Sequence, residues 1–214
     1  MKHLYIIGCG GFSKQVIEMF NEVNSIYQEY EVVGLIDDNP SLIDKNVLGY
    51  NVVGDTDYLE NLAKEKKIHA IIAIGQGNAR EAIFNKLPNV NWINLIHPNT
   101  IISRHISMGK GNIICGGTII NPDCKIGNHC NINIGCTLGH DVILEDFVTL
   151  MPGCNVSGNV FINKTSTIGT GSCIIQNVYV GENSIIGAGA VVLKDVDKSS
   201  VYVGIPARKI KNTN

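Results

Sequence analysis

The chain has 214 residues, which gives room for one large domain or two modest ones. Its formal net charge of −2 and the lack of a basic run argue against nucleic acid or an anionic membrane surface as a partner. The sequence contains no apolar run of about eighteen residues and no charged leader with a cleavage site, so we expect a cytoplasmic protein without membrane insertion.

Residues 1–95 alternate between predicted strands and predicted helices. Apolar runs predict buried strands, and amphipathic stretches predict helices, the first capped by Ser13 and the second by Asp55. The expected strands are 3–7, 31–36 and 68–74, and the expected helices run from about 14 to 27, from 55 to 66 and from 80 to 87. This succession predicts an α/β domain with a small parallel sheet of Rossmann type.

A glycine-rich loop follows the first predicted strand, at the place where such a sheet would bind a nucleotide. Gly8, Gly10 and Gly11 would let the backbone approach phosphates at the start of the next helix, whose free N–H groups attract anions. The third glycine of the dinucleotide fingerprint is missing, which argues against NAD. Asp37 stands where an acid would meet a ribose or base, although it also suits a turn before Asn39-Pro40.

Residues 96–192 keep a strict period of six. Every sixth residue is aliphatic or Met, without an insertion, and the residue four positions later is small or slender. The aliphatic series comprises Ile96, Ile102, Met108, Ile114, Ile120, Ile126, Ile132, Leu138, Leu144, Leu150, Val156, Ile162, Ile168, Ile174, Val180, Ile186 and Val192.

A period of six fits neither the 3.6 residues of a helical turn nor the alternation of one long strand. It is typical of short strands and turns stacked as a parallel β-helix, with eighteen residues per coil if three strands close one coil. The aliphatic residue would fill the interior, and the small one would fit beside the corner. A β-solenoid without a catalytic role is the alternative at this point.

Four of the seven cysteines occupy the small-residue position of the repeat. A buried cysteine packs as a small hydrophobe, so we expect a structural role for them. A disulfide is not expected in a reducing compartment, and no CxxC pair indicates a zinc site. These cysteines are Cys124, Cys130, Cys136 and Cys154.

Four stretches together resemble the bacterial nucleotide-sugar N-acetyltransferases, the hexapeptide-repeat family that acts on 4-amino-4,6-dideoxy sugars. They are Gly8-Cys-Gly-Gly-Phe-Ser13, Leu35-Ile-Asp-Asp38, Asn131-Ile-Asn-Ile-Gly-Cys-Thr-Leu-Gly-His-Asp141 and Val203-Gly-Ile-Pro-Ala-Arg208. The last two are the specific ones. The resemblance implies a left-handed β-helix, acetyl-CoA as co-substrate, a homotrimer with the active site between neighbouring β-helices, and a role in polysaccharide or glycan biosynthesis.

The resemblance also assigns roles to individual residues. His140 would be the general base and Asp141 the acid that orients it, since an imidazole takes and returns protons near neutral pH. Gly158, eighteen residues after His140, would sit about 5 Å away at the same corner of the next coil. Its N–H would hold the oxyanion. Asn133 matches a position that contacts the acceptor sugar.

One position departs from the family pattern. Many members carry a second histidine nine residues after the first, where this chain has Thr149. A threonine can hydrogen-bond substrate but cannot act as a base, which leaves His140 as the candidate base. His97, His105 and His129 form no close trio with it, so we expect no metal, unlike the carbonic anhydrases built on this fold.

At the C-terminus, residues 194–200 are expected to leave the β-helix and residues 202–208 to return along it. By resemblance this tail binds coenzyme A, with Pro206 in its signature and with Arg208 and Lys209 near the phosphates.

The sequence therefore predicts an N-terminal Rossmann-like domain, residues 1–95, that binds a nucleotide-linked amino sugar. A left-handed parallel β-helix, residues 96–214, would carry an acetyl-CoA-dependent N-acetyltransferase site and the coenzyme A tail. The amine would attack the thioester directly in a ternary complex, without metal or covalent enzyme intermediate. Two alternatives remain: an O-acetyltransferase acting on a free sugar such as sialic acid, and a non-catalytic scaffold.

Overall fold

A computed structural model describes residues 1–213, and it opens with a six-stranded sheet. The strand order is β3-β4-β2-β1-β5-β6, in which the β3–β4 pair is antiparallel and the other pairs are parallel. The strands are β1 (Lys2–Ile7), β2 (Tyr30–Ile36), β3 (Asn46–Val47), β4 (Tyr50–Gly54), β5 (His69–Ile72) and β6 (Asn91–Trp92).

Three α-helices and one 3-10 turn accompany this sheet. They are α1 (Gly11–Tyr27), η1 (Pro40–Leu42), α2 (Thr56–Glu65) and α3 (Gly77–Lys86). Asp55 caps α2 as predicted, since its carboxylate accepts from the Tyr58 N–H at 2.8 Å. The predicted Ser13 cap is wrong. Helix α1 already begins at Gly11, and the buried Ser13 hydroxyl donates to the Gly10 carbonyl.

The parallel strands of this sheet run in the order third, second, first, fourth, fifth. This matches the first five strands of the doubly wound nucleotide-binding order 3-2-1-4-5-6, so the predicted Rossmann-type architecture is confirmed. The order reverses between β1 and β5. Such a switch point opens a crevice beyond the carboxyl ends of the strands, here where the Gly8 and Gly75 loops emerge.

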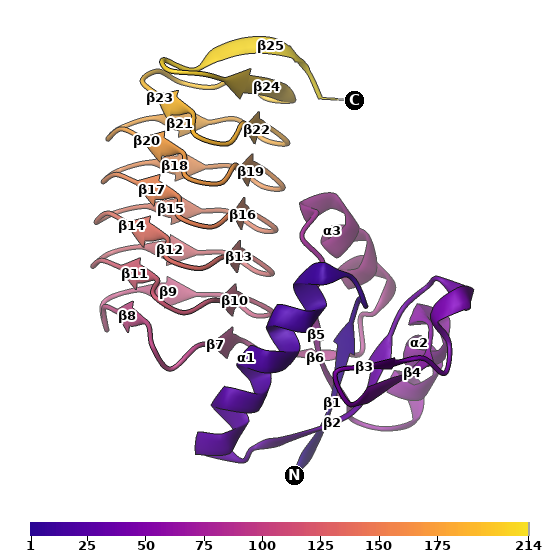
Figure 1. Cartoon of the computed structure of the whole chain (residues 1–214). Helices are drawn as coiled ribbons and strands as arrows, with labels where there is room; N and C mark the ends of the chain where they lie inside the picture. Colours follow the sequence, from indigo (N-terminus) through magenta and orange to yellow (C-terminus); the bar gives the residue numbers. More distant parts are fainter. Residues whose placement is uncertain (214) are drawn as a thin grey trace.

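From Leu95 onward the chain winds as a left-handed parallel β-helix, as predicted. Consecutive two-residue strands fall in turn on three faces, and each pairs in parallel with the strand eighteen residues away. Figure 1 shows the coils rising from β7 beside the N-terminal elements to β25 at the opposite end.

The three faces form three sheets. Sheet C contains β7 (Leu95–Ile96), β10 (Ile113–Ile114), β13 (Asn131–Ile132), β16 (Thr149–Leu150), β19 (Thr167–Ile168), β22 (Ile185–Ile186), β24 (Ser200–Val203) and β25 (Arg208–Asn212). Sheet D contains β8 (Ile101–Ile102), β11 (Ile119–Ile120), β14 (Thr137–Leu138), β17 (Asn155–Val156), β20 (Cys173–Ile174) and β23 (Val191–Val192). Sheet E contains β9 (Ser107–Met108), β12 (Lys125–Ile126), β15 (Ile143–Leu144), β18 (Phe161–Ile162) and β21 (Tyr179–Val180).

The predicted aliphatic series forms the interior of the β-helix. Each of its members is the second residue of a strand, and from Ile114 onward all are buried. The cysteines in the small-residue position are also buried, and they do more than fill space. The thiols of Cys124, Cys136 and Cys154 lie 3.1–3.2 Å from carbonyl oxygens of the next coil, to which they donate.

The path predicted for the tail is wrong. Residues 194–200 stay with the coils, because Val196 bridges to Val180 and β24 pairs in parallel with β22. Strand β25 then turns back antiparallel to β24. The tail therefore extends and closes sheet C at the end of the β-helix.

Among residues 1–213, no helix is long and apolar enough to cross a membrane.

Candidate functional site

The loop after β1 leaves backbone groups open at the start of α1. Gly8 has φ +105°, and a Cβ there would lie 2.8 Å from Ile74 Cγ1, so the fold itself requires this glycine. At Gly10 and Gly11 a Cβ would meet nothing within 4 Å. Helix α1 has no side-chain cap, so its first N–H groups are free to bind an anion in that space.

Asp37 lies at the end of β2 and supports the glycine loop. Its Oδ2 accepts from the Cys9 N–H at 2.8 Å, and its Oδ1 accepts from the Asn39 N–H at 2.9 Å. Burial and this carboxylate raise the pKa of the Cys9 thiol to about 12, so the thiol stays neutral. Asp37 thus holds the loop and the following turn, and its remaining lone pairs are what it could offer a ligand.

Arg80 joins the N-terminal elements to the β-helix. This side chain is fully buried on α3, and it donates to the carbonyls of Ile74 (2.9 Å) and Gly75 (2.7 Å) in the loop after β5. On the β-helix it donates to the carbonyls of His129 (2.9 Å), Phe147 (2.7 Å) and Val148 (3.2 Å) and to the hydroxyl of Thr149 (3.0 Å). Burial lowers its pKa to about 10, so it remains charged at neutral pH.

Sequence reasoning missed Arg80, since an arginine in a polar helix ordinarily faces water. It also missed Gln15 of α1. The Gln15 amide donates to Asn133 Oδ1 at 3.0 Å and lies 3.2 Å from the Cys115 sulfur. No sequence signal identifies either contact, because each joins residues far apart in the chain.

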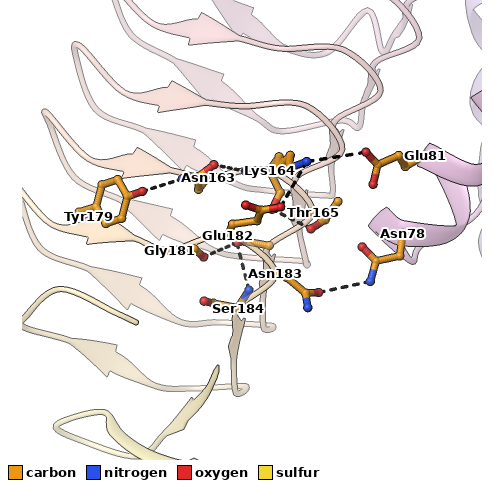
Figure 2. Close-up of polar contacts among 11 residues, drawn as sticks. Asn78, Glu81, Asn163, Lys164, Thr165, Tyr179, Gly181, Glu182, Asn183 and Ser184 are labelled. Carbon is orange, nitrogen blue, oxygen red and sulfur yellow. Dashed lines mark hydrogen bonds and ion pairs between the residues drawn. The ribbon is translucent and has the colours of Figure 1, made fainter. Parts of the chain in front are cut away.

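Helix α3 is also tied to the coils through polar groups at its exposed side. Figure 2 shows Asn78 of α3 reaching Asn183, a bond of 3.2 Å, while Glu81 faces Lys164. The Lys164 ammonium pairs with Glu182 at 3.2 Å and lies 4.0 Å from Glu81. These contacts add to Arg80 in fixing the N-terminal elements beside sheet C.

A cavity of about 310 Å³ lies where the sheet switch point meets sheet C. We call it the switch-point cleft. Its walls come from the start of α1, from the loop after β5 and from strands β13 and β16, and they include Gly11, Gln15, Gly75, Asn131, Asn133 and Thr149. The cleft therefore brings together Gly11, Asn133 and Thr149, which the sequence assigned to the acceptor. The other predicted acceptor residues, Gly8, Gly10 and Asp37, are not among the residues that line it.

Within the cleft, Asn133 and Thr149 are already partly engaged. Asn133 Oδ1 accepts from Gln15 and from the Ile134 N–H at 2.8 Å. The Thr149 hydroxyl accepts from Arg80 and donates to the Gly75 carbonyl at 2.8 Å. Thr149 therefore fastens the Gly75 loop to the β-helix.

His140 and Asp141 form an exposed pair at the corner after β14. His140 Nδ1 lies 2.7 Å from Asp141 Oδ2, and the two side chains are 65% and 51% exposed. Because a carboxylate only accepts, the proton of a neutral imidazole belongs on Nδ1 in this pair, which leaves the Nε2 lone pair open. Asp141 has φ +60°, the left-handed conformation common to the corners of this β-helix.

Gly158 lies against the His140 ring, one coil along. A Cβ at Gly158 would come within 2.8 Å of His140 Cε1 and Nε2. The Gly158 N–H has no acceptor among the hydrogen bonds of residues 1–213. A free donor, an imidazole and a carboxylate thus meet at one corner, the set that proton removal beside a developing oxyanion requires.

The chain does not bring this corner and the switch-point cleft together. His140 follows a strand of sheet D, whereas the cleft is walled by sheet C. His140, Asp141 and Gly158 are absent from the residues that line the cleft.

The tail residues lie at the far end of the β-helix. Arg208 and Lys209 begin β25, both are exposed, and Pro206 lies in the turn before it. Lys209 pairs with Asp197 at 3.1 Å, while Arg208 Nη1 donates to the Ala207 carbonyl at 3.0 Å.

The other histidines of the repeat region have separate environments. His97 Nε2 lies 2.8 Å from Glu22, His105 is exposed, and His129 is buried among aromatic rings. Residues 1–213 contain no group of three or more His, Cys, Asp or Glu side chains arranged to hold a metal ion.

Comparison with known proteins gives consistent matches. Residues 3–87 match the family model of the PglD N-terminal domain. The perosamine N-acetyltransferase from Caulobacter crescentus, solved with CoA and GDP-perosamine, is 30% identical with a TM-score of 0.91, over 99% of this chain and 98% of that one. The acetyltransferase domain of PglB from Neisseria gonorrhoeae, solved with acetyl coenzyme A, is 30% identical with a TM-score of 0.87, over 98% of this chain and 99% of that one.

A curated relative covers a smaller region. An uncharacterized protein of Acanthamoeba polyphaga mimivirus is 33% identical over 126 residues, which are 59% of this chain. The match spans 24% of that protein's own length.

Proposed function

This chain belongs to the hexapeptide-repeat family of nucleotide-sugar N-acetyltransferases, and we propose that it acetylates the amino group of a nucleotide-linked 4-amino-4,6-dideoxy sugar. Acetyl-CoA is the co-substrate. The observation that carries the proposal is the full-length likeness to an enzyme solved with both CoA and GDP-perosamine. The product would be an acetamido sugar for polysaccharide or glycan biosynthesis.

Residues 1–95 would bind the nucleotide sugar. The free N–H groups at Gly10 and Gly11, the open space beside them and their position at a sheet switch point support a diphosphate site in the cleft. Asp37 lies at the neighbouring strand end, where it would meet the nucleoside. Asn133 and Thr149 would contact the sugar from the wall of the β-helix, within the 310 Å³ cleft that they line.

Residues 96–214 would carry the chemistry. His140 Nε2 removes a proton from the sugar amine while Asp141 holds the Nδ1 proton and stabilises the imidazolium that forms. The amine nitrogen bonds to the thioester carbonyl carbon, and the Gly158 N–H stabilises the resulting oxyanion. The C–S bond then breaks, and the thiolate of coenzyme A takes the proton from His140. Pro206, Arg208 and Lys209 would hold the coenzyme.

We propose a homotrimer in which the site is completed by a second copy. What supports this is that the exposed His140 corner follows a strand of sheet D and none of its residues lines the cleft, which is walled by sheet C. A neighbouring β-helix packed against sheets D and E would bring its own faces to this corner and exclude water.

The test is an acetyl-transfer assay with acetyl-CoA and a panel of acceptors: GDP-perosamine, UDP-linked 4-amino-4,6-dideoxy sugars and free sialic acid. We expect release of coenzyme A with one nucleotide series and a product that survives hydroxylamine, since amides resist it and esters do not. Coenzyme A release with sialic acid alone would favour the O-acetyltransferase. No transfer and no thermal stabilisation by coenzyme A would favour a scaffold.

A further inference from the structure

Asn131 occupies a fixed orientation in the wall of the switch-point cleft. It is the first residue of β13, the residue is 2% exposed, and its Nδ2 donates to the Ile74 carbonyl at 2.9 Å. Turning the amide over would set two oxygens against each other, so this bond determines which atom is Oδ1. The Ile74 carbonyl also accepts from Arg80, which keeps this loop in place independently of Asn131.

The Oδ1 atom of Asn131 has no hydrogen-bond partner, although it is buried. Buried acceptors are nearly always paired, because an unpaired one has lost its water without compensation. Among residues 1–213, three residues have such unpaired buried side-chain atoms, and Asn131 is the one that lines the cleft. Because Asn131 is one of the residues that line the cleft, a ligand bound there that supplies a donor would satisfy this atom.

The neighbouring side-chain oxygens of the same wall, those of Thr149 and Asn133, are already engaged. Thr149 both accepts and donates within the protein, and Asn133 Oδ1 accepts twice. The opposite wall offers the free N–H groups at the start of α1, which favour an anion. The cleft thus matches a ligand that carries a phosphate at one end and hydroxyl or N–H donors at the other.

We propose that Asn131 determines acceptor specificity, its Oδ1 accepting a hydrogen bond from a hydroxyl or amide N–H on the ring of the nucleotide-linked sugar. This inference rests on the proposed function and deepens it. Acceptors that lack the donor would leave Oδ1 unpaired and bind less well, which is how a buried polar group discriminates between close analogues. Asn131 does not take part in proton transfer, so it acts on binding of the sugar.

The experiment compares Asn131→Leu with Asn91→Leu, a matched control. Asn91 is also the first residue of a two-residue strand, β6, and its Nδ2 also donates to a backbone carbonyl, that of Ile68. It is exposed, however, and lies at the edge of the N-terminal sheet, outside the residues that line the cleft. Steady-state kinetics use acetyl-CoA with GDP-perosamine or a UDP-linked 4-amino sugar, whichever the wild type turns over, and with deoxy analogues of that acceptor. For Asn131→Leu we expect kcat/KM for the full acceptor to fall by roughly 10- to 100-fold, mainly through KM of the sugar.

The KM for acetyl-CoA should stay unchanged. On the one deoxy analogue that lacks the relevant donor, kcat/KM of Asn131→Leu should equal that of the wild type. The Asn91→Leu kinetics should equal those of the wild type. If Asn131→Leu does not fold, Asn131→Ser, which is small and polar but too short to reach, replaces it in the same comparison.

Equal kcat/KM in wild type and Asn131 variants would overturn the inference while leaving the proposed function standing. An equal loss on every deoxy analogue would overturn it as well, because that result indicates a structural role. A wild type that acetylates no nucleotide-linked amino sugar would overturn the proposed function and this inference together.

Discussion

The switch-point cleft and the His140 corner are built in opposite ways. Around the cleft, Arg80 and Thr149 are buried and engaged in hydrogen bonds that join loops far apart in the chain. At the corner, the side chains of His140 and Asp141 are two-thirds and half exposed, and a hydrogen bond joins the two to each other. One region is pre-organised by its own chain, while the other stands open to water.

This difference indicates which part of the chemistry each region can do alone. A buried network holds its groups in place, so a ligand can find the cleft ready-made. An exposed imidazole–carboxylate pair is screened by water and gains little energy from its charges. The corner therefore needs a covering surface to become an efficient catalytic site, whereas the cleft does not.

The largest expected effect comes from removing the buried hydrogen bonds of Arg80. Replacing Arg80 with Met would leave two of the five carbonyls that its guanidinium serves, those of His129 and Phe147, without a donor. The other three have a second donor. We expect Arg80→Met to lower the free energy of unfolding by about 3 kcal/mol or more. Chemical denaturation measures this change, with the exposed Arg104→Met as control. Equal stability of the two variants would contradict the role of Arg80.

A second effect in the buried region around Arg80 depends on pH. Burial, and then the charge of Arg80, lower the pKa of His129 from 6.5 to about 4. The unfolded chain then binds the proton more readily than the folded one, so stability is full above pH 6.5 and is lost as the pH falls toward 4. The loss should reach about 3 kcal/mol.

Unfolding of wild type and His129→Leu at pH 7.5 and pH 4.5 measures this loss, since the difference between the two proteins removes the contribution of the carboxylates. A pH dependence that is identical in both would show that His129 is not the group responsible. Exposed His105→Leu provides the control for loss of a histidine.

On the open side, His140→Ala should leave stability unchanged and lower kcat by roughly 10²-fold or more, the usual contribution of a general base. We therefore expect opposite results from the two variants: His140→Ala loses turnover but not stability, and Arg80→Met loses stability. Stopped assays of acetyl transfer and a melting curve of the same preparation measure both. Near-wild-type turnover would remove His140 from its assigned role.

A smaller effect is expected at Gly158. An added methyl group would press on the His140 ring at 2.8 Å and turn it, so Gly158→Ala should lower kcat/KM by roughly 10-fold. In the His140→Ala background the same change should have little further effect, because the two residues act through one contact. Additive losses in the double variant would mean that Gly158 acts independently of the ring.

Much of the fold could be predicted from the sequence, because its signals are local and repeated. The six-residue period determines which side chains point inward, and eighteen residues per coil bring Gly158 to His140. The path of the tail could not be predicted, since it depends on strand pairing with residues of earlier coils. The start of α1 was missed because the helix begins at Gly11 without a side-chain cap.

The cleft was only partly predictable. Its glycines have a motif, but Arg80 and Gln15 act through contacts with residues dozens of positions away, for which the sequence holds no pattern. Thr149 was noticed only as a departure from the family, and its bonds to Arg80 and Gly75 depend on the folded arrangement. Contacts of this kind form where the folded N-terminal elements pack against the folded β-helix, so no local sequence pattern marks them.

The central claim is that the catalytic base and the acceptor cleft of one active site come from different copies of the chain. Complementation tests it directly. One variant is His140→Ala, and the other is Gly11→Phe, which fills the cleft at a position where the protein leaves open space. Co-expressed with two tags and purified as mixed trimers, they should regain about one third of wild-type activity, because one interface in three then has both parts intact. Activity no higher than that of the two parent variants would contradict the claim.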